Sequence, residues 1–155
     1  MRPLVIGVGN AWRGDDGVGL VVARIVGQLA GEAVEVRENA GDAAALVSLW
    51  EGRDRVLVVD AMCSGLEPGD VARFELGDDD PAGASLVTGA TFTSSHAFGV
   101  AEAVALAREL DALPPGLVLV GIEGERFEAG SALSPRVAEA AERVARRIAA
   151  DAAAS

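Results

Sequence analysis

The sequence predicts a single α/β domain, in which a mostly parallel sheet of about five strands lies between two layers of helices. Continuous apolar runs typical of buried parallel strands occur at Leu4–Val8, Val56–Val59 and Leu117–Ile122. Segments of helical periodicity separate these runs, and alternating strands and helices form parallel sheets covered on both faces. Because 155 residues suit one domain, we expect residues 1–155 to fold as one unit.

Two further segments alternate apolar and polar residues, which is typical of strands near the edge of a sheet. They are Val34–Arg37 and Val71–Leu76. The second is followed by a long segment of acids, glycines and hydroxyl residues, Gly77–Ser95, which we interpret as a loop.

Four helices are expected between and after the strands. Apolar residues recur at helical spacing from about Gly17 to Leu29 and from His96 to Leu110. Asp42 is a suitable N-cap for a short helix through Trp50, and Ser134 followed by Pro135 suits the start of the last helix. In such sheets ligands bind beyond the carboxyl ends of the strands, so the loops after the three buried strands should line one site.

The charge of the chain excludes some classes of partner. The net charge is −11, and every basic residue is arginine. Such a surface repels phosphate backbones and anionic lipid, so we expect neither nucleic acid nor membrane binding. The single cysteine, Cys63, cannot form an internal disulfide, and the sequence shows no secretory signal or apolar run of membrane-spanning length. A cytoplasmic location is therefore predicted.

The loop Gly7–Gly19 opens like the dinucleotide fingerprint G-x-G-x-x-G but departs from it. Trp12 stands where the third glycine is needed for close packing of the helix on the strand. Asp15 and Asp16 follow, and carboxylates there compete with a pyrophosphate for the positive end of the helix. We therefore expect no organic cofactor, although a dinucleotide or small-molecule binding domain is kept as an alternative.

Three residues that are far apart in the sequence are expected at the carboxyl edge of the sheet. One of the two aspartates Asp15 and Asp16 should cap the helix, and the other should project into the site. Asp60 ends an apolar strand, where a carboxylate is either an N-cap or a ligand or general base. His96, the only histidine, opens a helix and is either a surface residue or a metal ligand.

Two carboxylates and one imidazole form a mixed oxygen and nitrogen set that suits a transition metal such as zinc or nickel. Three protein ligands leave coordination positions open, as a catalytic or docking site requires. The residues thus predict that one of Asp15 and Asp16 converges with Asp60 and His96 on a divalent metal ion. A Cys63–His96 nucleophilic pair is less favoured, because nothing beside the cysteine lowers its pKa. Glu123 and Glu125 are interpreted as solvated loop carboxylates.

Taken together, these motifs resemble those of the hydrogenase maturation proteases, the endopeptidases of nickel–iron hydrogenases. The resemblance spans almost the whole chain, although Asp16 stands where the family often has the longer carboxylate of Glu, and family members often differ after Ile122. It is carried by four blocks: Gly7-Val8-Gly9-Asn10 with Asp15-Asp16-Gly17-Val18-Gly19, Val58-Val59-Asp60-Ala61, Ser94-Ser95-His96, and Gly121-Ile122-Glu123 with Leu133-Ser134.

The resemblance implies a mixed, mainly parallel sheet and a metal site at the positions of Asp16, Asp60 and His96. It also implies that the substrate is the precursor of a hydrogenase large subunit. The implied activity is removal of a C-terminal extension from this precursor after nickel insertion. In this interpretation nickel is supplied by the substrate, and the same three residues recognise it and act in catalysis. A nickel-binding chaperone without proteolysis remains an alternative, as does a general peptidase.

Overall fold

The sheet contains five strands in the order β2-β1-β3-β5-β4, and all but β4 are parallel. This arrangement comes from a computed structural model, which describes residues 2–76 and 95–154, with side chains from residue 100 onward in the second range. The bounds are β1 Leu4–Val8, β2 Glu35–Asn39, β3 Arg55–Met62, β4 Val71–Glu75 and β5 Gly116–Glu123. The mixed, mostly parallel sheet is confirmed.

The three apolar runs are the central strands, and the two alternating segments are the edges of the sheet that the described residues form. In β4, Phe74 packs on the core while Arg73 and Glu75 are exposed, so the alternation of the sequence becomes the two faces of the strand. β4 runs antiparallel to β5 and closes the sheet on that side.

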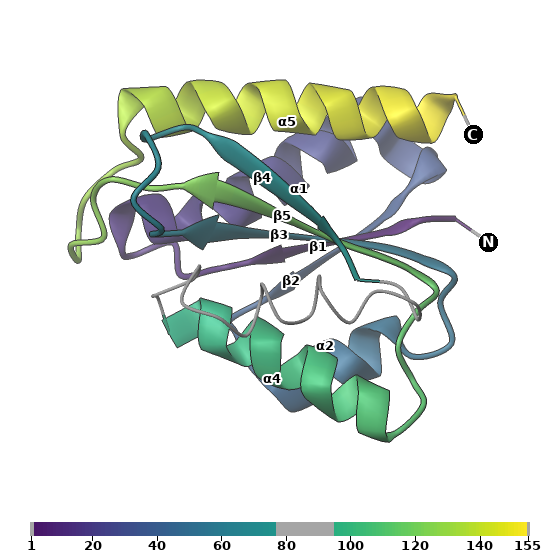
Figure 1. The fold of residues 1–155 in the computed structure, drawn as a ribbon. Coiled ribbons are helices and arrows are strands. Elements are labelled where there is room, and N and C mark those ends of the chain that lie inside the picture. Colours follow the sequence, from purple (N-terminus) through teal and green to yellow (C-terminus); the bar gives the residue numbers. More distant parts are fainter. Residues whose placement is uncertain (1, 77–94, 155) are drawn as a thin grey trace.

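Helices cover both faces of the sheet (Figure 1). Helices α1 (Val18–Ala30) and α5 (Pro135–Ala153) pack on one face and against each other. Helices α2 (Ala43–Trp50) and α4 (Ser95–Glu109) pack on the other. Two short 3-10 helices complete the set, η1 (Gly14–Gly17) before α1 and η2 (Gly31–Ala33) after it. The predicted three-layer arrangement is therefore confirmed.

Successive residues of each strand divide between two cores. Val56 and Val58 of β3 face α2 and α4, whereas Val59 and Ala61 face α1 and α5. Asp60 has the parity of the first pair, so its side chain leaves the sheet on the α4 face. The fully buried Trp50 contributes the largest side chain to the α2 and α4 core.

The structure corrects the predicted end of one strand. Strand β3 does not end at Asp60 but continues to Met62, because Asp60, Ala61 and Met62 pair with the end of β5.

Asp42 caps α2 as expected, accepting a hydrogen bond from the Ala45 amide at 3.2 Å. Ser134 precedes α5 but makes no capping bond. The predicted loop Gly77–Ser95 lies outside the described residues except for Ser95, which begins α4.

The connections place a topological switch point between β1 and β3. The chain leaves β1 through α1 to reach β2 on one side, and then passes through α2 to β3 on the other side of β1. Open α/β sheets bind ligands at the carboxyl ends of strands where the order reverses in this way. None of the helices in the described ranges combines the length and hydropathy needed to cross a bilayer.

Candidate functional site

Glycines bring the start of α1 into contact with the ends of two strands. A Cβ on Gly19 would collide with the carbonyl oxygens of both Val59 and Val8. Gly14 adopts a φ of +59°, in the left-handed region that favours glycine, and lies against the carbonyl of Arg126. This close packing sets η1 against β3, at the switch point.

Asp15 is a structural anchor rather than a helix cap. Its carboxylate accepts hydrogen bonds from the amides of Glu125 at 2.8 Å, Arg126 at 2.9 Å and Ser134 at 2.7 Å. The Ser134 hydroxyl donates a fourth bond at 2.8 Å, which explains why it does not cap α5. Asp15 is fully buried, so these charge-assisted bonds replace its lost hydration.

Asp16 follows in the same 3-10 helix and is 2% exposed. Its carbonyl accepts a hydrogen bond from the Asn10 amide at 3.3 Å, which closes the loop between β1 and η1. The amides of Glu125 and Ser134 donate to the preceding residue, Asp15, which therefore has the supporting role. Both aspartates lie in the first turn of η1, but Arg13 and Gly17 occupy the N-cap positions of η1 and α1, so the expectation that one aspartate is the N-cap is wrong.

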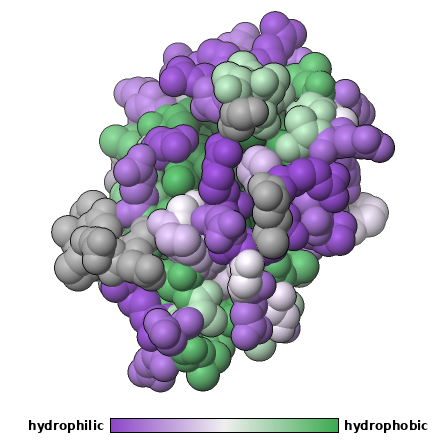
Figure 2. Space-filling view, turned by 90° about the vertical axis from the view of Figure 1, so that its right-hand side faces the viewer, coloured by the Kyte–Doolittle hydropathy of each residue, from purple (hydrophilic) through white to green (hydrophobic). Residues whose placement is uncertain are grey.

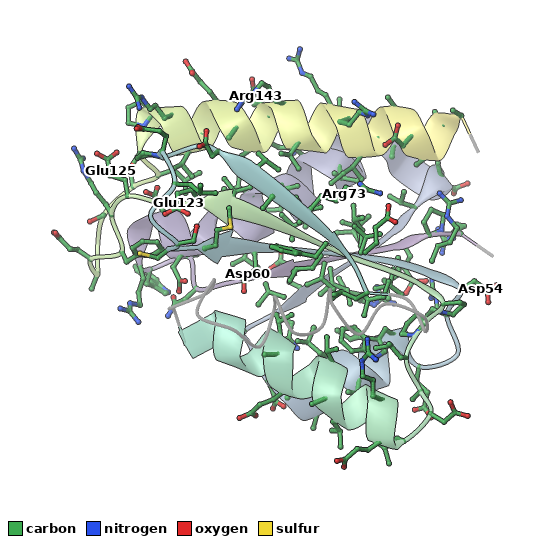
Figure 3. All side chains as sticks on the ribbon, in the orientation of Figure 1. Asp54, Asp60, Arg73, Glu123, Glu125 and Arg143 are labelled. Atoms are coloured by element: carbon green, nitrogen blue, oxygen red, sulfur yellow. The ribbon has the colours of Figure 1, made fainter. Side chains whose placement is uncertain are left out.

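Asp60 is fully buried near the carboxyl end of β3. One carboxylate oxygen accepts a hydrogen bond from the Ala61 amide at 2.8 Å. In Figure 3 its side chain lies on the side of the sheet that faces α4. The alternative that it caps a following turn is wrong, because the residues after it continue the strand.

His96 is the second residue of α4. The start of this helix lies at the same edge as the arrowheads of the parallel strands, below the sheet in the view of Figure 1. The His96 backbone therefore lies at the carboxyl edge, on the face toward which Asp60 points. Its side chain is outside the described part of the structure, so its convergence with Asp16 and Asp60 stays a prediction.

Glu123 is not the solvated loop carboxylate that the sequence suggests. It is 3% exposed and accepts hydrogen bonds from the Ser64 amide, at 3.1 and 3.0 Å to its two oxygens, and from the Ser64 hydroxyl at 2.7 Å. This bidentate contact holds the turn after β3, which contains the exposed Cys63. Glu125, by contrast, is exposed as expected.

Two supporting residues, Asp15 and Glu123, were thus not assigned from the sequence. Their partners lie more than 50 residues away in the chain, 110 residues for Asp15 and Glu125, and 59 for Glu123 and Ser64. One available signal was the position of Glu123 at the end of a buried strand beside β3, where a carboxylate needs nearby donors.

The described residues alone do not form a metal centre. They contain no group of three or more His, Cys, Asp or Glu side chains arranged to hold an ion. Asp16 and Asp60 supply two buried carboxylates at the switch point, and a further nitrogen donor is needed to complete a mixed set for a transition metal. The site therefore suits an ion only if His96, or a ligand brought by the substrate, joins them.

Comparison with known proteins identifies relatives over most of the chain. A family model described as hydrogenase maturation protease matches residues 22–151, a range that includes Asp60 and His96 and begins after Asp16. The hydrogenase expression/formation protein HupD of Bradyrhizobium diazoefficiens is 34% identical over 139 residues, which are 88% of this chain and 70% of the relative.

Solved structures extend the similarity to the fold. The hydrogenase maturating endopeptidase HybD from E. coli matches with a TM-score of 0.77 and 27% identity, over 96% of this chain and 90% of that one. The [NiFe] hydrogenase maturation protease HybD from Thermococcus kodakarensis matches with a TM-score of 0.76 and 26% identity, over 98% of this chain and 99% of that one.

Proposed function

The chain belongs to the hydrogenase maturation protease family and is a hydrogenase maturation endopeptidase, and from that premise we propose that it cleaves the C-terminal extension from a nickel–iron hydrogenase large-subunit precursor after nickel insertion. The observation that carries the proposal is the burial of Asp16 and Asp60 at the switch point of the sheet, 2% and 0% exposed. Buried carboxylates need hydrogen bonds or a charged partner, and a pair of them at a ligand-binding edge is suited to binding a cation.

The partner we propose is the nickel ion of the precursor, which belongs to the substrate. Asp16 and Asp60 supply oxygen ligands and His96 supplies nitrogen, a combination suited to nickel. The backbone position of His96 in the first turn of α4, at the edge where β3 ends, supports this assignment. Recognition of the loaded ion would delay cleavage until nickel insertion is complete.

Two chemical roles for the site remain open. The nickel ion can polarise the scissile carbonyl or lower the pKa of a bound water, so that hydroxide forms near neutral pH. Alternatively, Asp60 or Asp16 accepts the proton of the attacking water as a general base. Either role places the reacting carbonyl beside the carboxylates, at the end of β3.

The test compares cleavage of nickel-loaded and nickel-free precursor by the wild type and by Asp16→Asn, Asp60→Asn and His96→Ala. We expect the wild type to cleave only loaded precursor, and each variant to lower the initial rate at least about 100-fold, as for loss of a catalytic group. Glu125→Gln is the matched control, because it removes an exposed carboxylate from the same rim and should leave the rate unchanged.

Normal processing by His96→Ala would contradict the site assignment. Equal cleavage of loaded and nickel-free precursor would contradict nickel recognition and favour a general peptidase. Nickel binding without any cleavage of the precursor would favour the chaperone alternative.

A further inference from the structure

A cavity lies at the opposite end of the sheet from the candidate active site. It has a volume of about 680 Å³ and opens where the parallel strands begin, between the sheet and the C-terminal half of α5. Its floor is a row of aliphatic residues in register, Val5, Leu57 and Val118. The last two are only half-buried, although they face the α1 and α5 core. Helix α5 therefore leaves part of this apolar surface uncovered.

The rim of this cavity is strongly basic. Arg55, Arg73, Arg143 and Arg147 line it together with one acid, Asp151, which gives the lining a net charge of +3. The whole chain carries −11, so this is a local reversal of sign. Figure 2 views this end of the molecule and shows hydrophobic residues set among hydrophilic ones below α5.

The arginines converge from three elements. Arg143 and Arg147 lie one turn apart on α5, and Arg73 stands on β4 opposite Val120 of β5. In Figure 3, Arg73 lies between the sheet and α5. Arg55 begins β3 at the mouth of the cavity.

The contacts of Arg73, Arg143 and Arg147 within the protein are long or exposed. Arg73 lies 3.9 Å from Glu75, Arg147 lies 3.3 Å from Asp151 between two exposed side chains, and Arg143 donates to the Gly69 carbonyl at 3.4 Å. Exposed pairs of this kind contribute little stability. Each guanidinium carries five N–H donors, so these contacts leave donors for a ligand.

We propose that this cavity binds an amphiphilic carboxylate, with an aliphatic body on the Val5, Leu57 and Val118 floor and a carboxylate head against the arginine rim. Guanidinium groups bind carboxylates through paired hydrogen bonds, and the cavity volume falls in the range of small-molecule sites. The lining contains no aromatic residue on which a nucleotide base would stack. The site is independent of the proposed protease function, because it lies at the other edge of the sheet.

The test is calorimetric titration of the whole chain with decanoate, with decanol as the uncharged equivalent and acetate as the ion without a tail. We expect decanoate alone to bind, with an affinity that falls as sodium chloride is added. The double variant Arg143→Gln/Arg147→Gln should weaken binding at least tenfold. Arg146→Gln is the matched control on the same helix outside the cavity lining, and should bind like the wild type.

Equal binding of decanol, or an equal loss in Arg146→Gln, would overturn the proposal. So would binding to vesicles of anionic lipid without binding to free decanoate. Binding that persists in His96→Ala, a variant expected to lose protease activity, would support two separate sites.

Discussion

Two adjacent aspartates of η1 illustrate how far a residue's role depends on distant parts of the chain. The local sequence predicts that one of Asp15 and Asp16 caps the helix and the other projects into the site, and only the family resemblance selects Asp16 for the site. The amides of Glu125, Arg126 and Ser134 all donate to Asp15, which gives that residue a structural role, and the role of Asp16 in the site stays a prediction. These contacts form only in the folded molecule, so local sequence carries no sign of them.

The structural role of Asp15 and the proposed role of Asp16 predict different effects of two isosteric substitutions. Asp15→Asn replaces a carboxylate oxygen by a donor that faces the amides, and should lower the free energy of unfolding by about 2–3 kcal/mol. Asp16→Asn should cost less stability but abolish processing of nickel-loaded precursor. Urea unfolding and the cleavage assay measure both. A loss of stability in Asp16→Asn as large as that in Asp15→Asn would contradict the assignment.

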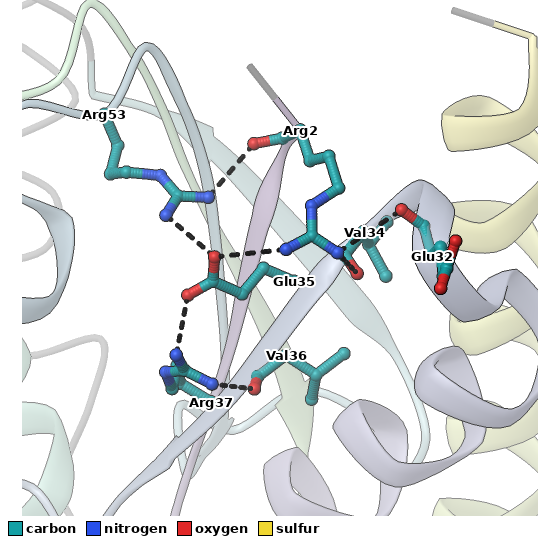
Figure 4. Close-up of polar contacts among 7 residues, drawn as sticks. All are labelled: Arg2, Glu32, Val34, Glu35, Val36, Arg37 and Arg53. Atoms are coloured by element: carbon teal, nitrogen blue, oxygen red, sulfur yellow. Dashed lines mark hydrogen bonds and ion pairs between the residues drawn. The ribbon is translucent and has the colours of Figure 1, made fainter.

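Glu35 is the centre of a basic cluster on the edge strand β2 (Figure 4). It contacts Arg53 and Arg37 at 3.0 Å and Arg2 at 3.6 Å. The hydrogen bond from Arg53 and the charges of Arg53, Arg37 and Arg2 hold the pKa of Glu35 below its usual 4.5, against an opposing effect of desolvation. The folded state therefore binds this proton more weakly than the unfolded state does.

The sign of this shift predicts a pH-dependent stability. A lowered pKa stabilises the folded state above about pH 4.5, and the contribution is lost as the pH falls through the folded-state pKa. Glu35→Gln should therefore be less stable than the wild type at neutral pH, with a difference that shrinks in acid. Urea unfolding across this range measures it. When Arg53→Gln is present in both proteins, the stability difference caused by Glu35→Gln should change less with pH. An unchanged pH dependence would contradict the assignment of the lowered pKa to Arg53.

At the scale of elements, most of the fold could be predicted because apolar periodicity is a local property. The three buried strands and four helices occur where the sequence indicates. The end of β3 was missed because a buried carboxylate, Asp60, looks like the end of an apolar run, whereas pairing with β5 carries the strand onward to Met62.

Helix α1 offers a prediction from two glycines with different surroundings. Gly19→Ala should destabilise the protein by about 3 kcal/mol, because its Cβ would collide with backbone carbonyls that cannot move aside. Gly27→Ala places its Cβ 3.6 Å from Val36, an ordinary contact, and should stabilise by about 0.5–1 kcal/mol through helix propensity. Thermal unfolding of both variants measures the contrast, and equal effects would contradict the close packing of α1 on the strands.

At the scale of the whole molecule, the sheet edge of the candidate site could be predicted from the sequence, whereas the cavity between the sheet and α5 could not. The site follows from strand order, since carboxyl ends of parallel strands share one edge. The cavity depends on how closely α5 lies over Leu57 and Val118. The distance between a helix and a sheet cannot be predicted from local sequence patterns. Convergence of His96 with the two carboxylates stays a prediction.

The anchoring of Asp15 by the segment Glu125–Ser134, and the packing of α1 on α5, have a consequence for biosynthesis. The loop that carries Asp16 leaves the ribosome before the segment that supports it, because synthesis runs from the N-terminus. A nascent chain therefore cannot complete this edge of the sheet until Ser134, which lies 119 residues after Asp15, has been synthesised.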